Sequence, residues 1–180
     1  MTSFKHRWLL AMTILVALLA PAGCTAQDRP ESPATEATGR ATTVDRVLDD
    51  WHAAASVADA ERYFGHFASD GVFLGTDTSE RWPVAEFRAY ADPYFSEGRG
   101  WTYVPSERHV MFSSDGDLAW FDEKLTSEKY GRLRGTGVLR RSDGNWKIVH
   151  YNMTFTVPNG IAAEVVSLIR SRSGDAPPAR

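Results

Sequence analysis

The chain has 180 residues, with 23 acidic and 20 basic side chains and a formal net charge of −3 at pH 7. Hydrophobic residues make up 43% and aromatic residues 12% of the chain, which is typical of a folded domain and excludes a disordered protein. The near-neutral balance argues against a nucleic-acid partner, because nucleic acids bind basic surfaces. The single cysteine excludes a disulfide framework and a cysteine-rich zinc site.

The N-terminal segment has the pattern of an export signal. Lys5 and Arg7 precede the uncharged run 9–20, which is too short to cross a bilayer as a helix. Residues 1–23 are therefore predicted to be a signal peptide, and the protein is predicted to be secreted across the cytoplasmic membrane.

Cys24 follows this segment directly, in the sequence Pro21-Ala22-Gly23-Cys24. This resembles a bacterial lipobox, in which the cysteine becomes the lipidated first residue, although Pro21 stands where Leu is usual. The alternative is plain secretion, with cleavage after Ala22 or Ala26. A lipid on Cys24 would anchor the protein to the cell envelope. No other membrane contact is predicted, because anionic headgroups repel the acidic mature chain.

Two segments flank the expected domain. Residues 24–42 are rich in Pro, Thr, Ala, Glu and Arg and are predicted to be a flexible tether. Residues 171–180 have the same character and are predicted to be a disordered tail. The folded domain is therefore expected at 43–170, a length that suits one domain.

Helical spacing of apolar side chains dominates the first half of this domain. The spacing begins after Thr43, which is predicted to cap a first helix, and again after Asp59, where a second helix runs as far as Phe67. A third helix is expected after Pro83, with Pro93 distorting its end.

Strand patterns dominate the second half. The turn pairs and alternating residues predict a short strand at 72–75 after the turn Asp70-Gly71, then the long strands 101–112, 118–127, 130–141 and 146–155, and a final helix at 161–170. Helices followed by an antiparallel sheet predict an α+β fold.

This order of elements resembles the nuclear transport factor 2-like (NTF2-like) superfamily. The segments similar to its SnoaL-like branch are Phe67–Phe73, Gly75-Thr76-Asp77, Glu80-Arg81-Trp82, Trp120-Phe121-Asp122 and Asp143–Ile148. The resemblance implies a cone-shaped fold, in which a curved antiparallel sheet wraps around the N-terminal helices and leaves an apolar cavity open at one end. It also implies a homodimer through the outer face of the sheet.

Asp77 is the first candidate for chemistry. In the steroid-isomerase members of the superfamily, a carboxylate at the end of the first strand is the base, and here Gly75 occupies that position. Asp77 lies two residues later and is predicted to reach the cavity mouth. The alternative is that Asp77 caps the turn or pairs with Arg81.

Asp122 and His150 are the second candidates. Strand side chains alternate, so either Asp122 or Glu123 must point inward. An inward Asp122 could form an acid–base dyad with His150. The alternatives are an ion pair of Asp122 with Arg132 or Arg134, and a hydrogen-bonded core role for His150.

The remaining polar residues form no familiar motif. The sequence contains no Gly-rich phosphate loop, no Gly-x-Ser-x-Gly and no closely spaced histidine pair, so no metal and no cofactor are predicted. His52, His66 and His109 are expected to be structural or solvent-facing.

Large rings are unusually frequent. Most must fill the core, but some are expected to line the cavity and bind a flat apolar ligand. The predicted ligand-binding residues are Trp51, Phe73, Tyr94, Trp101 and Trp120.

Two functions follow from these candidates. The first is a secreted or lipid-anchored domain that binds a small, mostly apolar molecule without catalysis. The second is a cofactor-free lyase, isomerase or hydrolase that uses Asp122 or Asp77 with His150.

Overall fold

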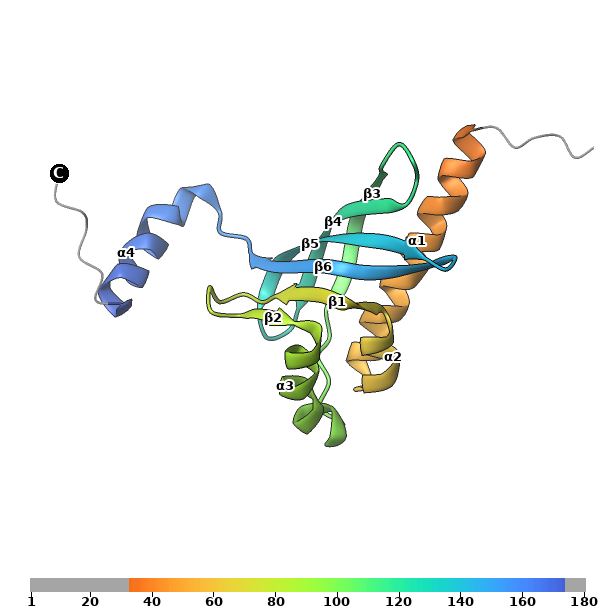
Figure 1. The fold of residues 1–180 in the computed structure, drawn as a ribbon. Helices are drawn as coiled ribbons and strands as arrows, with labels where there is room; N and C mark the ends of the chain where they lie inside the picture. The colour runs from red at the N-terminus through yellow and green to blue at the C-terminus, as the bar shows by residue number, and fades with distance from the viewer. Residues whose placement is uncertain (1–32, 174–180) are drawn as a thin grey trace, which may run out of the picture. The chain divides into compact units, whose positions relative to one another are not determined.

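The computed structural model describes residues 33–173, which form one six-stranded sheet and its helices (Figure 1). The elements in chain order are α1 (Pro33–Ser56), α2 (Ala60–Gly65), β1 (Phe67–Leu74), β2 (Arg81–Pro83), α3 (Val84–Ser96), β3 (Val104–Phe112), β4 (Leu118–Ser127), β5 (Gly131–Ser142), β6 (Asn145–Phe155), the short 3₁₀ helix η1 (Asn159–Ile161) and α4 (Ala162–Ser173). The predicted signal peptide at 1–23 and Cys24 lie outside the described residues, so export and lipidation stay predictions.

The sheet has the strand order β2-β1-β6-β5-β4-β3. The four strands β3 to β6 pair antiparallel in sequence order, as expected for a meander, and β2 pairs antiparallel with β1. β1 and β6 are parallel, which the sequence did not predict. The predicted α+β fold, with a curved sheet, N-terminal helices and a final helix, is confirmed.

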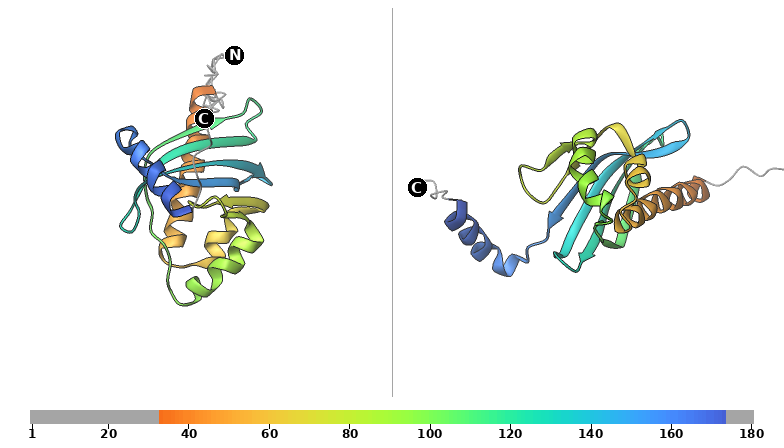
Figure 2. Two further views of the ribbon diagram at one scale, coloured as in Figure 1. Left: turned by 90° about the vertical axis from the view of Figure 1, so that its left-hand side faces the viewer. Right: turned by 90° about the horizontal axis from the view of Figure 1, so that it is seen from below.

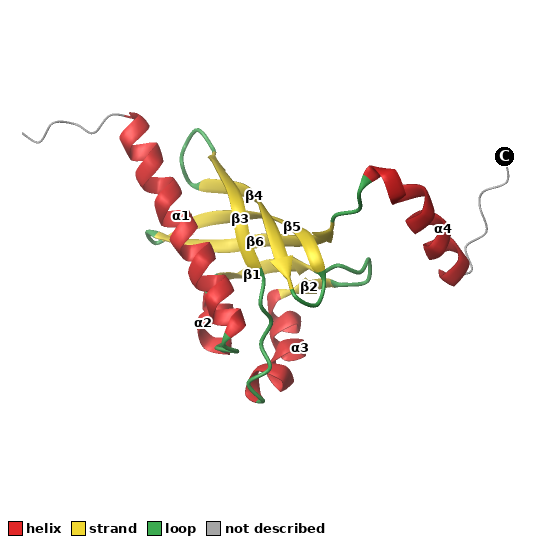
Figure 3. Ribbon diagram, turned by 180° about the vertical axis from the view of Figure 1, so that it is seen from behind, coloured by secondary structure: helices red, strands yellow, loops and turns green. Residues whose placement is uncertain are grey.

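The three N-terminal helices pack on the inner face of the sheet. α1 lies against this face and contacts β3, as seen from behind in Figure 3. α2 and α3 lie side by side next to β1 in both views of Figure 2. Val44, Leu48 and Trp51 of α1 join Phe121 and Ile148 of the sheet in one buried core. None of the helices between residues 33 and 173 is long and apolar enough to cross a membrane.

Tyr63 lies at the centre of the aromatic core. Its ring stacks on Trp51 at 5.2 Å between centroids and meets Trp101 edge-on at 5.8 Å. It also meets Phe87 and Phe95 edge-on, at 6.1 and 5.6 Å. Because such ring pairs prefer defined angles, this cluster fixes α1, α2 and α3 relative to one another.

α1 begins at Pro33 rather than at the predicted cap, Thr43. The Thr43 hydroxyl donates to the Gly39 carbonyl at 3.0 Å, and Thr42 donates to Thr38 in the same way, so both threonines lie inside the helix. Part of the predicted tether is therefore helical. Its alanines and arginine favour a helix, although the segment lacks an apolar face.

β1 begins earlier than predicted, because the second helix ends at Gly65 and not near Phe67. Asp70-Gly71 is not a turn but part of an irregularity in the pairing of β1 with β6. At Gly71 a Cβ would lie 2.9 Å from the Ile148 carbonyl oxygen, so only glycine fits this close approach. The predicted cap at Asp59 is confirmed, since its carboxylate accepts from the Arg62 amide at 3.1 Å.

Gly135 and Gly137 of β5 make room on the inner face. A Cβ on Gly135 would lie 2.4 Å from the Tyr151 hydroxyl and 2.9 Å from Glu123 Oε1. A Cβ on Gly137 would lie 2.7 Å from the Phe121 ring. Bare backbone at these positions therefore lets the side chains of β4 and β6 lean over β5.

We expect the substitution Gly135→Ala to lower the free energy of unfolding by about 1–3 kcal/mol, because the new methyl group displaces the Tyr151 hydroxyl. Urea unfolding measures this loss. Gly65→Ala is the control, since its Cβ meets nothing within 4 Å at the end of α2, and it should be neutral or stabilising. Equal stability of the two variants would contradict the tight packing at Gly135.

Candidate functional site

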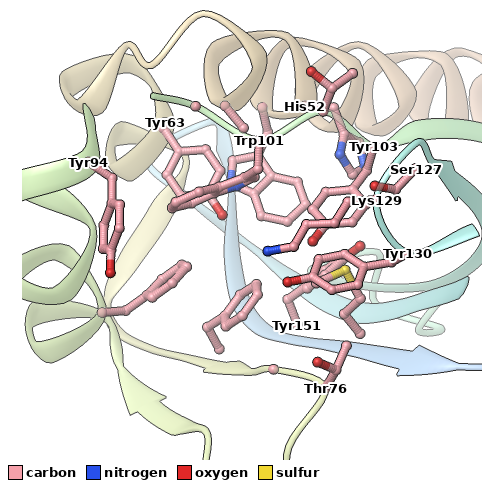
Figure 4. A pocket seen from close by; sticks show the side chains of 18 of the residues that line it. His52, Tyr63, Thr76, Tyr94, Trp101, Tyr103, Ser127, Lys129, Tyr130 and Tyr151 are labelled. Atoms are coloured by element: carbon pink, nitrogen blue, oxygen red, sulfur yellow. The ribbon is translucent and has the colours of Figure 1, made fainter. Parts of the chain in front are cut away.

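A cavity of about 990 Å³ lies between the inner face of the sheet and α1, α2 and α3. Its inner end is formed by buried side chains, namely Trp51, His52, Tyr63, Phe73 and Tyr151. Its mouth is formed by more exposed residues of the loops and of α3, among them Thr76, Tyr94, Tyr103, Lys129 and Tyr130 (Figure 4).

Four of the five rings predicted to bind a ligand line this cavity: Trp51, Phe73, Tyr94 and Trp101. Trp120 does not, because it projects from the outer face of β4 and is 43% exposed. Its neighbours Ala119 and Phe121 occupy the buried face instead. Ligand binding by the four cavity rings stays a prediction.

Glu123 is the most deeply buried charged residue at the inner end, with 1% exposure. Its Oε1 lies 2.9 Å from Nε2 of His52, which lines the cavity from α1 and is 7% exposed. The same oxygen accepts a hydrogen bond from the Tyr151 hydroxyl at 3.3 Å. The other oxygen, Oε2, accepts from Nε of Arg108 at 2.9 Å. The carboxylate is thus held by three side chains from α1, β6 and β3.

Arg108 extends this network to the surface of α1. Its Nη1 donates to the Asp45 carbonyl oxygen at 3.2 Å and to the Asp49 carboxylate at 2.9 Å. The Arg108 side chain is 8% exposed, whereas Asp49 is 63% exposed. Breaking a buried ion pair leaves an uncompensated charge, so this network fixes α1 to the sheet.

The charges of the network follow from its surroundings. Burial raises the pKa of the Glu123 carboxyl, but the hydrogen bond from His52 and the positive charges of His52 and Arg108 outweigh burial, so the net pKa is below its ordinary value of 4.5. Glu123 is therefore ionised at neutral pH. Burial raises the pKa of Tyr151 well above 10, and the charge of Glu123 raises it further, so the phenol stays protonated.

Tyr63 provides a second phenol at the inner end. Burial raises its pKa well above 10, and a hydrogen bond with the Trp101 indole lowers the pKa only in part. Figure 4 shows this hydroxyl next to the Trp101 nitrogen. The inner end therefore combines apolar rings with two protonated hydroxyls and one imidazole.

Asp122 lies outside the cavity, which corrects its predicted place. Its carboxylate projects from the outer face of β4 and lies 3.2 Å from Nδ1 of His109 on β3, and both side chains are well exposed. One of the two adjacent carboxylates does point inward, as strand alternation requires, but that residue is Glu123.

His150 also lies on the outer face, so the predicted dyad with Asp122 does not form at the cavity. The pairing of β5 with β6 shifts between Val138 and Leu139, which leaves Val149 as an extra residue in β6. Such a bulge reverses the alternation of side chains beyond it. Tyr151 takes the inward position as a result, and His150 faces outward.

Asp77 performs the alternative role considered for it. Its carboxylate accepts hydrogen bonds from the Ser79 amide at 2.9 Å and from the Ser79 hydroxyl at 2.6 Å, so it stabilises the loop between β1 and β2. The hydrogen bonds from Ser79 lower the pKa of Asp77. It is exposed and does not line the cavity.

Sequence reasoning did not assign His52 or Glu123 to the site, since Glu123 was only the alternative to Asp122 as the inward carboxylate and His52 was expected to be structural or solvent-facing. The signal for His52 was its position on the apolar face of the first helix, next to Trp51. The signal for Glu123 was its alternation with Phe121 and Leu125 on β4. Within residues 33–173, no three His, Cys, Asp or Glu side chains converge in a way that could hold a metal ion.

The model of the SnoaL-like domain family matches residues 44–158, more than half of the chain. The chain belongs to this family. Among curated proteins, none matches it.

Solved structures share the fold at low sequence identity. An NTF2-like protein of unknown function from Pseudomonas putida aligns with a TM-score of 0.56 and 17% identity, covering 68% of this chain and 90% of its own. A proposed scytalone dehydratase from Novosphingobium aromaticivorans aligns with a TM-score of 0.59 and 12% identity, covering 69% and 89%. A proposed ketosteroid isomerase from Parabacteroides distasonis aligns with a TM-score of 0.52 and 15% identity, covering 64% and 86%. At these identities the likeness shows the fold alone.

We expect the substitution Glu123→Gln to lower the free energy of unfolding at pH 7 by about 3–5 kcal/mol, because the buried Arg108 then loses its buried counter-charge and keeps only the more exposed Asp45 and Asp49. The pKa of Glu123 is depressed in the folded state, so its stabilisation is present above about pH 4.5 and is lost as the pH falls through the folded value. The difference between wild type and variant should therefore shrink below pH 4.5. Urea unfolding from pH 7 to pH 3 measures both effects.

The neighbouring substitution Asp122→Asn is the control for this experiment. Because Asp122 forms only an exposed pair with His109, its loss should change the stability by less than about 1 kcal/mol. A loss at Asp122 as large as that at Glu123, or a difference for Glu123→Gln that is independent of pH, would contradict the role of the buried network.

Proposed function

We propose that this protein binds a small, mostly apolar molecule that contains one or more flat rings. The observation that carries the proposal is the cavity of about 990 Å³, which lies at the upper end of the volumes typical of small-molecule sites. An apolar ligand binds favourably in a cavity lined by rings, because it displaces water that cannot hydrogen-bond to most of the wall.

The distribution of the rings supports a flat ligand. At the inner end, Phe73 and Phe87 stack with their centroids 4.2 Å apart, and both rings line the cavity. At the mouth, Trp82 stacks on Tyr90 at 5.2 Å, and Tyr94 lies next to Tyr90 at 5.5 Å. Ring faces are therefore available along the whole length of the cavity.

Titration with the neutral fluorescent probe N-phenyl-1-naphthylamine tests this proposal. We expect its fluorescence to rise on binding, and the substitution Thr76→Trp to weaken the affinity at least about tenfold by filling the mouth with an indole. Thr78→Trp is the matched control, because Thr78 is an exposed residue of the same loop outside the cavity wall.

Two results would reject ligand binding in the cavity. The first is no fluorescence change with the wild type. The second is equal affinity of the two tryptophan variants, which would place the probe elsewhere on the surface.

A second function, cofactor-free acid–base catalysis, is favoured by the contact of His52 with Glu123. Because the ionised Glu123 can only accept a hydrogen bond, the form of His52 that can act as a base carries its proton on Nε2 and its lone pair on Nδ1. Figure 4 shows the His52 imidazole directed into the cavity beside Tyr103. A base with an anionic partner and two nearby phenols suits removal of a proton from a ring-bearing substrate, as in a lyase or isomerase. In this proposal His52 and Glu123 have the roles first predicted for His150 and Asp122.

The flat apolar compound 5-nitrobenzisoxazole tests this second function. His52 Nδ1 would take the proton of its isoxazole C–H, the electrons of that bond would form the nitrile, and the N–O bond would break to leave a coloured cyanophenolate. We expect a wild-type rate well above that of buffer, and a loss of about 100-fold or more in His52→Gln.

His109→Gln is the control for this assay, because His109 is exposed on the outer face. A wild-type rate equal to that of buffer, or a full rate in His52→Gln, would reject catalysis by His52 and leave ligand binding as the function.

We also propose that the protein is exported and held at a membrane surface by a lipid on Cys24, and that two copies pair through the outer faces of their sheets. In support of the pairing, one row of paired residues across the outer face of the sheet contains three aliphatic side chains, one tryptophan and one histidine, and no carboxylate, Lys or Arg. This row consists of Met111, Trp120, Val138, His150 and Val72.

A further inference from the structure

Two permanently cationic side chains, Arg99 and Lys129, line the cavity, and they differ in their partners. The Arg99 guanidinium pairs with the Glu97 carboxylate at 2.7 Å and lies 4.9 Å from the ring centroid of Tyr94. Lys129, in the turn between β4 and β5, forms no ion pair with a carboxylate in the part of the chain that the structure describes. Its ammonium lies 4.7 Å from the ring centroid of Tyr130.

The Lys129 side chain is directed into the cavity. Figure 4 shows it extending inward from the β4–β5 turn, with its ammonium beside Tyr130 and facing the space below Trp101. The hydroxyl groups of Tyr103 and Tyr130 lie on the same side of the cavity in this view. The hydrogen bond and the charge interaction with Tyr130 raise the pKa of Lys129, so the ammonium keeps its proton at neutral pH.

The two carboxylates that line the mouth do not neutralise Lys129. Glu80 accepts a hydrogen bond from the Asp77 amide at 3.1 Å, and its side chain lies against Gly75, so it is turned into the loop between β1 and β2. Glu128 is exposed to solvent. Within residues 33–173 neither carboxylate forms an ion pair with the Lys129 ammonium, although the charge of Glu80 reaches the mouth and raises the pKa of Tyr90 and of Tyr103.

We propose that the molecule bound in this cavity is a ring-bearing organic acid, with its rings against the aromatic wall that Trp101 and Tyr63 form and its anionic group on the Lys129 ammonium. This inference rests on the proposed function and names the ligand class of the same site. The orientation follows from the charges of the two ends. At the inner end the Glu123 charge is compensated by Arg108 and the wall consists mostly of apolar rings, whereas Lys129 at the mouth attracts an anion.

The neutral donors near Lys129 strengthen this assignment. A carboxylate has two oxygens with about four acceptor positions, and one ammonium satisfies only part of them. The hydroxyls of Tyr103 and Tyr130 can donate to the rest. Burial raises the pKa of Tyr103 to about 12, so that phenol stays a donor.

Isothermal titration calorimetry with a matched pair of probes tests this inference on the full chain. The pair is 2-naphthoate and 2-naphthalenemethanol, which share the ring system and differ in the charged group. We expect the wild type to bind the acid at least about tenfold more tightly than the alcohol, because a charge-assisted hydrogen bond accounts for that ratio.

Three variants assign the preference to one side chain. Lys129→Met should abolish the preference for the acid while changing the affinity for the alcohol less than about twofold. Lys129→Arg should keep the preference for the acid, because it keeps the positive charge. Lys124→Met is the matched control, since Lys124 is an exposed cation of β4 that pairs with Glu107 outside the cavity. This control should keep the wild-type preference.

The possible results separate the two proposals. If the wild type binds the alcohol as tightly as the acid, or if Lys129→Met keeps the preference, the acid assignment is overturned and the cavity remains a site for neutral rings. If neither probe binds, and N-phenyl-1-naphthylamine also fails to bind, the proposed function fails and the acid assignment fails with it.

Discussion

The buried carboxylate of Glu123 is the constraint around which the cavity is arranged. A carboxylate in a protein interior is tolerated only when hydrogen bonds and opposite charges replace its lost water, and here His52, Arg108 and Tyr151 supply them. These partners come from three different elements. The position of α1, the bulge in β6 and the inner face of β4 are therefore tied to one another through a single side chain.

The same contact links stability to the proposed function. His52 bonds to Glu123 through one ring nitrogen and belongs to the cavity wall, so the group that holds α1 in place also meets any ligand at the inner end. The apolar rings around it exclude water and strengthen each electrostatic interaction. The mouth provides the opposite environment, since Lys129 and the phenols there remain close to solvent. A ligand with one apolar end and one charged end matches this gradient.

Most of the fold could be predicted from the sequence, because the helical and strand periods are strong and turn residues mark the hairpins. The site residues were harder to predict, because a shift of one residue along a strand changes which side chain faces the cavity. Asp122 and Glu123 are adjacent, and alternation alone does not say which one faces inward. Val149 forms a bulge that no local pattern announces, and it moves His150 outward. Contacts between distant elements, such as Arg108 with Asp49, leave no signal in the local sequence.

The two glycines of β5 have a consequence for the size of the hollow. Gly135 and Gly137 have no side chains, so the space above β5 is filled by side chains of β4 and β6. The cavity could therefore be enlarged or reduced by shortening or lengthening the side chain of Met153, which lines it and pairs with Gly135, without changing β5 itself.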